Sequence, residues 1–147
     1  MRCHTNPKQA VAFLHGGNTA PNLSGSVSFT QKKDCVLVVA NIEGLPQNEA
    51  GFYGFHIHEG GACTGELFAD SKGHYNPKDT PHPHHAGDLP PIIQCKSKAY
   101  LSFLTDRFKV AVLIGRTVIL HSEPDDFYTQ PSGNAGTKIA CGIIQRA

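Results

Sequence analysis

Histidine is the residue type whose placement in this chain most directly predicts chemistry. The 147 residues contain nine histidines, and seven of them fall between residues 56 and 121. His56 and His58 stand two apart in a strand-like run, so both imidazoles project from the same face of a strand. Such a pair is either two surface histidines on a solvated sheet face or two metal ligands on a rigid element.

Further candidate ligands lie downstream and favour the metal interpretation. They are side chains with imidazole or carboxylate groups: His74, His82, His84, His85, Asp88 and His121. Imidazole binds copper and zinc, and a carboxylate completes a zinc-compatible set. A Pro/His-rich loop over residues 82–85 that collects metal adventitiously is the alternative. Because the candidates are spread over two strands and a loop, they cannot form a linear tag, and the sequence predicts a metal site.

Short strand-like segments separated by turns must position these side chains. They cover residues 9–14, 25–30, 35–42, 51–58, 99–104, 116–121 and 138–144. Seven or eight short strands in one domain predict an antiparallel sandwich or barrel, while residues 107–114 are ambiguous between helix and strand. Two long connections, 59–91 and 122–137, interrupt the pattern. Long loops inside a domain are usually functional or disordered, and these two flank the histidine-bearing strand ends.

Composition excludes several classes of function. Thirteen basic and twelve acidic residues leave a formal charge of +1, which gives no reason to expect a nucleic-acid partner. No stretch approaches 18 apolar residues, so we expect no membrane span. Because no export signal is visible, we expect a cytoplasmic protein. Removal of a signal peptide would instead place it in the periplasm or outside the cell.

Five motifs in order resemble the copper/zinc superoxide dismutase family. They are GFHIHE at 54–59, GHYNP at 73–77, HAGDLP at 85–90, GRTVILH at 115–121 and GNAGTKIACG at 133–142. The resemblance runs from about residue 9 to the end, and the compact second loop is similar to bacterial members. It implies one domain over 1–147 with an eight-stranded antiparallel Greek-key β-barrel. A loose tail at 1–8, a metal-binding loop at 59–91 and an electrostatic loop at 122–137 complete the expected organisation.

The resemblance also implies the ligands. The copper ligands are His56, His58, His74 and His121, and the zinc ligands are His74, His82, His85 and Asp88. His74 is thereby the ring shared by both metals. His82 is assigned as a zinc ligand by its offset from His74, and His84 is the neighbour most easily confused with it. Asp125 matches the carboxylate that links a copper-ligand histidine to a zinc-ligand histidine.

The implied activity is that of an antioxidant enzyme that converts superoxide to dioxygen and hydrogen peroxide. Copper would cycle between oxidation states, zinc would be structural, and His74 and Lys138 would be the catalytic residues. A non-enzymatic copper/zinc-binding protein on the same fold is the alternative. A zinc hydrolase is disfavoured, because no nucleophile set beside an open zinc position is apparent.

Lys138 is a departure from the family pattern, which usually has Arg at the mouth of the copper channel. The charge is retained, but an ammonium lacks the planar fork of a guanidinium. We therefore expect activity to be reduced and not abolished. A solvated lysine that merely begins a strand is the alternative interpretation.

The five cysteines divide into two groups under the resemblance. Cys63 and Cys141 match the family's intrasubunit disulfide, whereas the alternative is that they are buried free thiols. Cys3, Cys35 and Cys95 have no family role and are expected to be reduced thiols. The family commonly forms homodimers, while bacterial monomers occur, so both states are compatible with the sequence.

Overall fold

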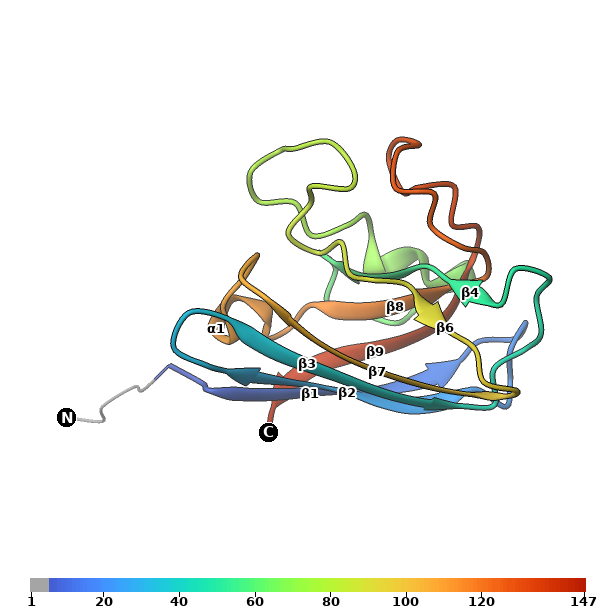
Figure 1. The fold of residues 1–147 in the computed structure, drawn as a ribbon, viewed down its shortest axis with the longest axis horizontal. Helices are drawn as coiled ribbons and strands as arrows, with labels where there is room; N and C mark the ends of the chain where they lie inside the picture. The colour runs from blue at the N-terminus through green and yellow to red at the C-terminus, as the bar shows by residue number, and fades with distance from the viewer. Residues whose placement is uncertain (1–5) are drawn as a thin grey trace.

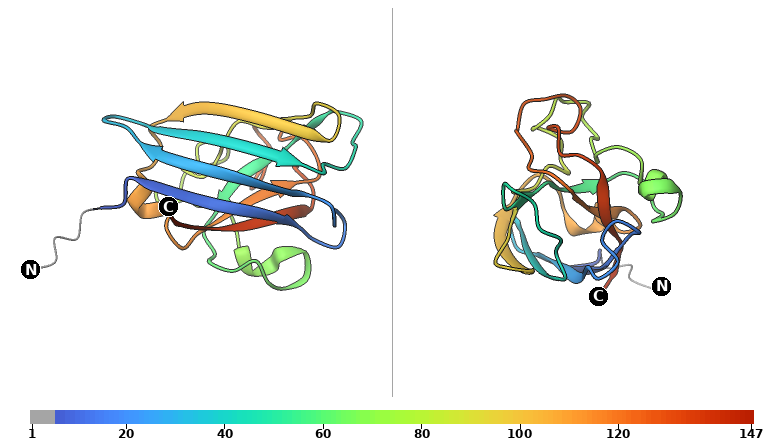
Figure 2. Two further views of the ribbon diagram at one scale, coloured as in Figure 1. Left: turned by 90° about the horizontal axis from the view of Figure 1, so that it is seen from below. Right: turned by 90° about the vertical axis from the view of Figure 1, so that its right-hand side faces the viewer.

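The computed structural model describes residues 6–147 and is built almost entirely from antiparallel strands (Figure 1). A seven-stranded sheet has the order β5-β8-β9-β1-β2-β3-β7, and a small second sheet pairs β4 with β6. The strands are β1 Gln9–Gly16, β2 Ser24–Gln31, β3 Val36–Glu43, β4 Phe52–Tyr53, β5 Phe55–His58, β6 Ile92–Ile93, β7 Lys98–Thr105, β8 Thr117–His121 and β9 Lys138–Arg146. The large sheet curls strongly into a half-barrel with β5 and β7 as its edges (Figure 2).

Alternating side chains explain the curled sheet and its core. In β1 the small or apolar residues Ala10, Ala12 and Leu14 are buried, while the alternate residues Phe13 and His15 are exposed. Strands β2 and β3 repeat this period of two, as expected for strands with one face on a core. In contrast, all residues of β5 and β8 are buried. Both faces of these two strands are therefore covered, and the histidines of β5 lie in the interior.

The two long loops provide that cover, because both rise from the same side of the sheet (Figure 1). The loop at 59–91 contains a short 3-10 segment, η1 (Glu66–Ser71). It is joined to β5 by backbone hydrogen bonds, such as Tyr75 N–H to the Ile57 carbonyl at 2.8 Å. The loop at 122–137 is closed at its base by Ser122 N–H, which donates to the Thr137 carbonyl at 2.9 Å.

The predicted all-β antiparallel fold is confirmed, with differences in detail. Nine strands occur within residues 6–147, two more than the predicted segments, and one of the two arises because the run at 51–58 is divided between the two sheets. The division falls at Gly54, whose N–H donates to the Glu123 carbonyl at 2.8 Å. The two-residue strand β6 was not predicted. The ambiguous segment 107–114 contains a single helical turn, α1 (Val110–Leu113).

The predicted N-terminal tail at 1–8 lies largely outside the described residues, as does Cys3. Lys8, at its end, already contacts the sheet, since its carbonyl accepts a hydrogen bond from Gln31 N–H at 2.7 Å. Among residues 6–147, no helix has the length and apolar character needed to cross a membrane.

Candidate metal centre

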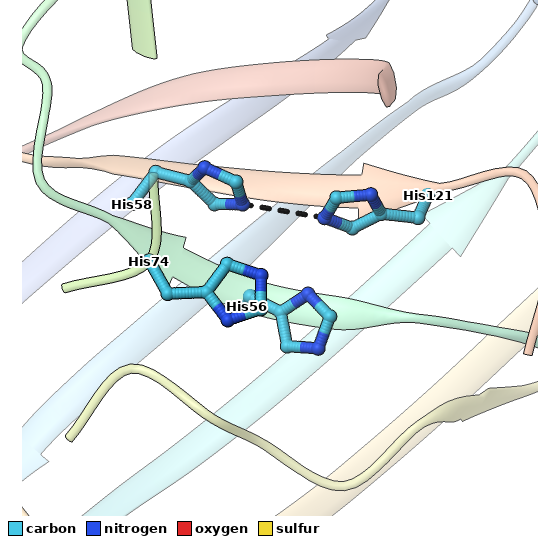
Figure 3. Close-up of side chains that lie close together, drawn as sticks. All are labelled: His56, His58, His74 and His121. Carbon is cyan, nitrogen blue, oxygen red and sulfur yellow. Dashed lines mark hydrogen bonds between the residues drawn. The ribbon is translucent and has the colours of Figure 1, made fainter. Parts of the chain in front are cut away.

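Four buried histidine rings meet beside the edge strand β5 (Figure 3). His56 and His58 come from β5, His121 ends the neighbouring strand β8, and His74 comes from the loop at 59–91, where it forms an isolated bridge with His58. One nitrogen from each ring lies within 4.8 Å of the others. Strand alternation explains the placement, since Phe55 and Ile57 point into the core and the two histidines point to the opposite face.

In His58 and His121, a hydrogen bond at Nδ1 determines that Nε2 is the nitrogen that faces this cluster. His58 Nδ1 lies 2.7 Å from the Lys72 carbonyl oxygen, and His121 Nδ1 lies 3.4 Å from the Gly136 carbonyl oxygen. A carbonyl only accepts, so each Nδ1 carries the proton and each Nε2 presents a lone pair. The two Nε2 atoms face one another at 3.2 Å (Figure 3). Two lone pairs at that distance repel each other, and a cation between them removes the repulsion.

Asp125 connects this cluster to a second one. Its two carboxylate oxygens accept hydrogen bonds from His56 Nε2 and from His82 Nε2, each at 2.8 Å. Because a carboxylate accepts only, both rings must carry their proton on Nε2. The Nδ1 atoms of His56 and His82 then point away from Asp125. Both are buried and have no hydrogen-bond partner among the described residues.

The second cluster gathers around the carboxylate of Asp88. The Nδ1 atom of His74 lies 2.8 Å from Oδ1, and the Nδ1 atoms of His82 and His85 lie 3.0 and 3.2 Å from Oδ2. The His82 contact is close but is not aligned as a hydrogen bond. Three ring nitrogens and one carboxylate form the donor set that zinc prefers. All four side chains come from one loop.

His74 belongs to both clusters. Its Nδ1 faces Asp88 and His85, while its Nε2 is buried without a hydrogen-bond partner among the described residues and belongs with the other three histidines. Three of the ring nitrogens that metal binding requires are thus buried and have no hydrogen-bond partner within residues 6–147. Since buried polar atoms are normally satisfied, the residues present fit a four-nitrogen copper site and a zinc site that share one ring.

The electrostatics of the site favour neutral, metal-binding imidazoles. Burial lowers the pKa of His56 to about 4, and burial also lowers the pKa values of His58 and His121 well below the ordinary value. Burial raises the pKa of Asp125, but the hydrogen bonds from His56 and His82 outweigh it and hold this pKa well below its usual range. Metal ligands must be deprotonated, so these shifts prepare the site for cations.

A disulfide and a lysine complete the surroundings. Cys63 and Cys141 are bonded, with their Cα atoms 5.7 Å apart, which confirms the predicted pairing and ties the loop at 59–91 to β9. The ammonium of Lys138 donates to Ser71 Oγ and to the Lys72 carbonyl, each at 2.8 Å, and to the Phe68 carbonyl at 3.4 Å. The Lys72 carbonyl therefore holds both Lys138 and His58.

A surface cavity of about 370 Å³ opens onto the histidines. His58, His74 and His121 line it, together with Lys72 and Lys138. A small anion that enters this cavity meets two lysines and three of the four histidines of the copper-side cluster. Burial lowers the pKa of Lys138.

The structure brings together all seven predicted metal ligands and Asp125, and it leaves His84 exposed at the surface. Sequence reasoning missed Lys72 and Ser71. Lys72 holds His58 through its backbone carbonyl, which any residue type offers, so its identity carried no signal. Ser71 lies three residues before His74 and is fully buried, but an isolated serine in a loop does not indicate a lysine partner.

An antiparallel half-barrel that carries two metal sites joined by one histidine defines a binuclear metalloprotein. The sequence profile of the copper/zinc superoxide dismutase (SODC) family matches residues 23–144. The chain belongs to this family, and its copper and zinc sites are the two clusters described above.

Curated relatives agree over most of their length. The chain is 34% identical over 143 residues to a Cu-Zn superoxide dismutase 2 of Aquifex aeolicus (strain VF5), which covers 87% of this chain and 82% of the relative. It is 33% identical over 143 residues to the Cu-Zn superoxide dismutase of Legionella pneumophila, covering 92% and 86%. A Cu-Zn superoxide dismutase of Paramecium bursaria Chlorella virus 1 is 32% identical over 156 residues, covering 95% and 79%.

Proposed function

We propose that this chain is a superoxide dismutase, which converts two superoxide anions and two protons to dioxygen and hydrogen peroxide. The observation that carries the proposal is His74, whose Nε2 belongs to the four-histidine copper cluster and whose Nδ1 belongs to the zinc cluster. When bound, copper supplies the one-electron chemistry and zinc supplies a fixed charge. The chain's own residues must bind the anion, orient the rings and move a proton.

His74 is the residue that we propose moves the proton. Its Nε2 is buried and free of any hydrogen bond to the described residues, and His74 is one of the residues that line the cavity. Its Nδ1 is held by the zinc cluster, which keeps the ring oriented. A nitrogen placed in this way can hold a proton during one half of the cycle and deliver it to the second superoxide.

Lys138 is proposed to stand where the family usually has arginine and to attract the anion by charge. All three N–H groups of its ammonium have protein oxygens as partners. It is therefore saturated with hydrogen bonds and contributes charge to the cavity without a free donor for the substrate. Local positive charge raises the encounter rate of a small anion.

Metal reconstitution tests the function directly. The purified chain is loaded with both ions, its metal content is measured, and the decay of a pulse of superoxide is followed. We expect one copper-type and one zinc-type site and fast second-order decay, which His74→Ala abolishes. Binding of both metals without any decay of superoxide would identify the non-enzymatic metal-binding alternative instead.

Compartment and assembly are also proposals. We propose a cytoplasmic location, supported by the exposed free thiol of Cys95, since thiols are kept reduced in the cytosol. Cell fractionation tests it, and recovery from the periplasm or medium would refute it. A homodimer and a monomer are both compatible with the family, and sedimentation equilibrium distinguishes the two.

A further inference from the structure

Arg107 lies in the segment that leads from β7 to β8, and its guanidinium reaches the zinc loop. Its Nη1 donates to the carbonyl oxygens of Pro83, His85 and Asp88, at 2.7, 3.2 and 3.4 Å. His85 and Asp88 are zinc ligands. We propose that Arg107 is a positioning residue that fixes the zinc-ligand segment 83–88 and thereby tightens zinc binding. The proposal rests on the zinc assignment of this cluster.

The location of segment 83–88 explains why it needs a second attachment. The half-barrel is open between its edge strands β5 and β7. On the β5 side the segment is attached through its backbone, with Ile57 N–H donating to the Gly87 carbonyl at 2.8 Å and His56 forming a bridge with Asp88. On the side of β7, Arg107 makes the attachment. The segment is thus held from both edges of the opening.

The base of Arg107 is itself fixed. Its N–H donates to Oγ1 of Thr105, the last residue of β7, at 3.2 Å. The next residue, Phe108, is buried and packs edge-on against Phe29 of β2, with ring centroids 6.2 Å apart. The backbone on either side of Arg107 is therefore anchored to the large sheet, and the side chain transmits this position to the loop.

Charge and geometry predict opposite effects of Arg107 on zinc. A guanidinium near a zinc site repels the cation, so an effect through charge alone would weaken zinc binding. An effect through position would strengthen it, because the carbonyls it holds belong to the ligands themselves. Residues that orient metal ligands typically contribute about 10-fold to 100-fold in affinity. The sign of the change in a charge-removing variant therefore separates the two.

The test is zinc affinity of the full-length chain, measured with zinc alone against a competing chelator. We expect Arg107→Met to weaken zinc binding about 10-fold, and Arg107→Lys, which keeps N–H donors on a shorter side chain, to weaken it by a smaller factor. Arg146→Met is the matched control, since Arg146 is an exposed arginine at the end of β9. It should bind zinc like the wild type.

The possible results can be told apart as follows. Unchanged or tighter zinc binding in Arg107→Met, or an equal loss in Arg146→Met, would overturn the proposal. Should Arg107→Met fail to fold, Arg107→Lys and the absorption spectrum of its cobalt(II) form decide the matter, because the spectrum reports ligand geometry. A wild-type chain that does not bind zinc would refute the proposed function itself, whereas equal affinities in wild type and variants would refute only the role of Arg107.

Discussion

The copper cluster and the zinc cluster are built on different foundations. Three of the four copper-side histidines stand on paired strands, β5 and β8, in the interior of the molecule. All zinc-side ligands come from the loop at 59–91. A strand fixes a side chain through its backbone ladder, but a loop needs separate attachments, and here Asp125 and Arg107 provide them. We therefore expect substitutions of residues that are not ligands to lower zinc affinity more than copper affinity.

The largest effect is expected from removing a strand-borne ligand. His121→Ala should remove copper binding and lower the rate of superoxide decay more than about 100-fold, since a direct ligand contributes more than the residues around it. Zinc binding should persist, because His121 does not belong to the zinc cluster. Metal analysis and superoxide decay check both statements. His84→Ala is the control and should retain activity, and loss of zinc in His121→Ala would contradict the separation of the two sides.

A smaller effect is expected from the residue that joins the two sides. Asparagine at position 125 offers one acceptor oxygen, so Asp125→Asn leaves either His56 or His82 without its partner. We expect both metals to bind about 10-fold to 100-fold more weakly, with the greater loss for zinc. Competition with a chelator measures each metal, with the exposed Asp34→Asn as control. A greater loss of copper affinity than of zinc affinity would contradict the expectation that the zinc site is the more sensitive of the two.

Acid should destabilise the metal-free protein because of the buried histidines of the copper cluster. Burial lowers the pKa of His56 to about 4 and lowers the pKa values of His58 and His121, whereas the unfolded chain titrates near 6.5. Below about pH 6.5 these three histidines are protonated in the unfolded state but remain neutral in the folded state. Stability therefore falls as the pH drops from 7 towards 4, by about 1.4 kcal/mol per pH unit for each histidine.

Asp88 and Asp125 do not alter this sign, because their pKa values are lowered and they stay ionised across the range. Urea unfolding of the metal-free chain at several pH values gives the measurement. Stability that is constant between pH 7 and pH 4.5 would contradict the prediction.

The smallest effect concerns the cavity that leads to the copper cluster. Lys138→Glu should lower the second-order rate about 10-fold at low ionic strength, since it reverses a charge that attracts the anion. The dependence on salt should also reverse its sign. Rates measured across a salt series check this, and an unchanged rate at low salt would remove Lys138 from the mechanism.

Lys138→Arg tests the same position with the charge kept. A guanidinium has five donors, and the three oxygens around Lys138 Nζ leave some of these free for the substrate. We expect a higher rate than in the wild type. An equal rate would mean that charge alone suffices there.

Much of the site could be predicted because it follows from side-chain type and strand alternation. His56 and His58 share a face in any strand, and the offset from His74 under the family resemblance placed His82, rather than the exposed His84, in the zinc cluster. The roles of Lys72 and Arg107 could not be predicted, because both depend on backbone carbonyls that every residue type supplies. The division of 51–58 into two strands was missed for a related reason, since it depends on a hydrogen bond from Gly54 to a distant loop.

Gly133 shows how closely the loop at 122–137 fits over the metal centre. Its φ of +70° favours glycine, and a Cβ added there would lie 1.9 Å from Oδ1 of Asp125 and 2.7 Å from Nε2 of His82. Any larger residue at 133 would push the backbone there away from Asp125 and His82, and so disturb the carboxylate that links the two metal sites. The position of Asp125, and with it the link between the two metal sites, therefore depends on the absence of a side chain at residue 133.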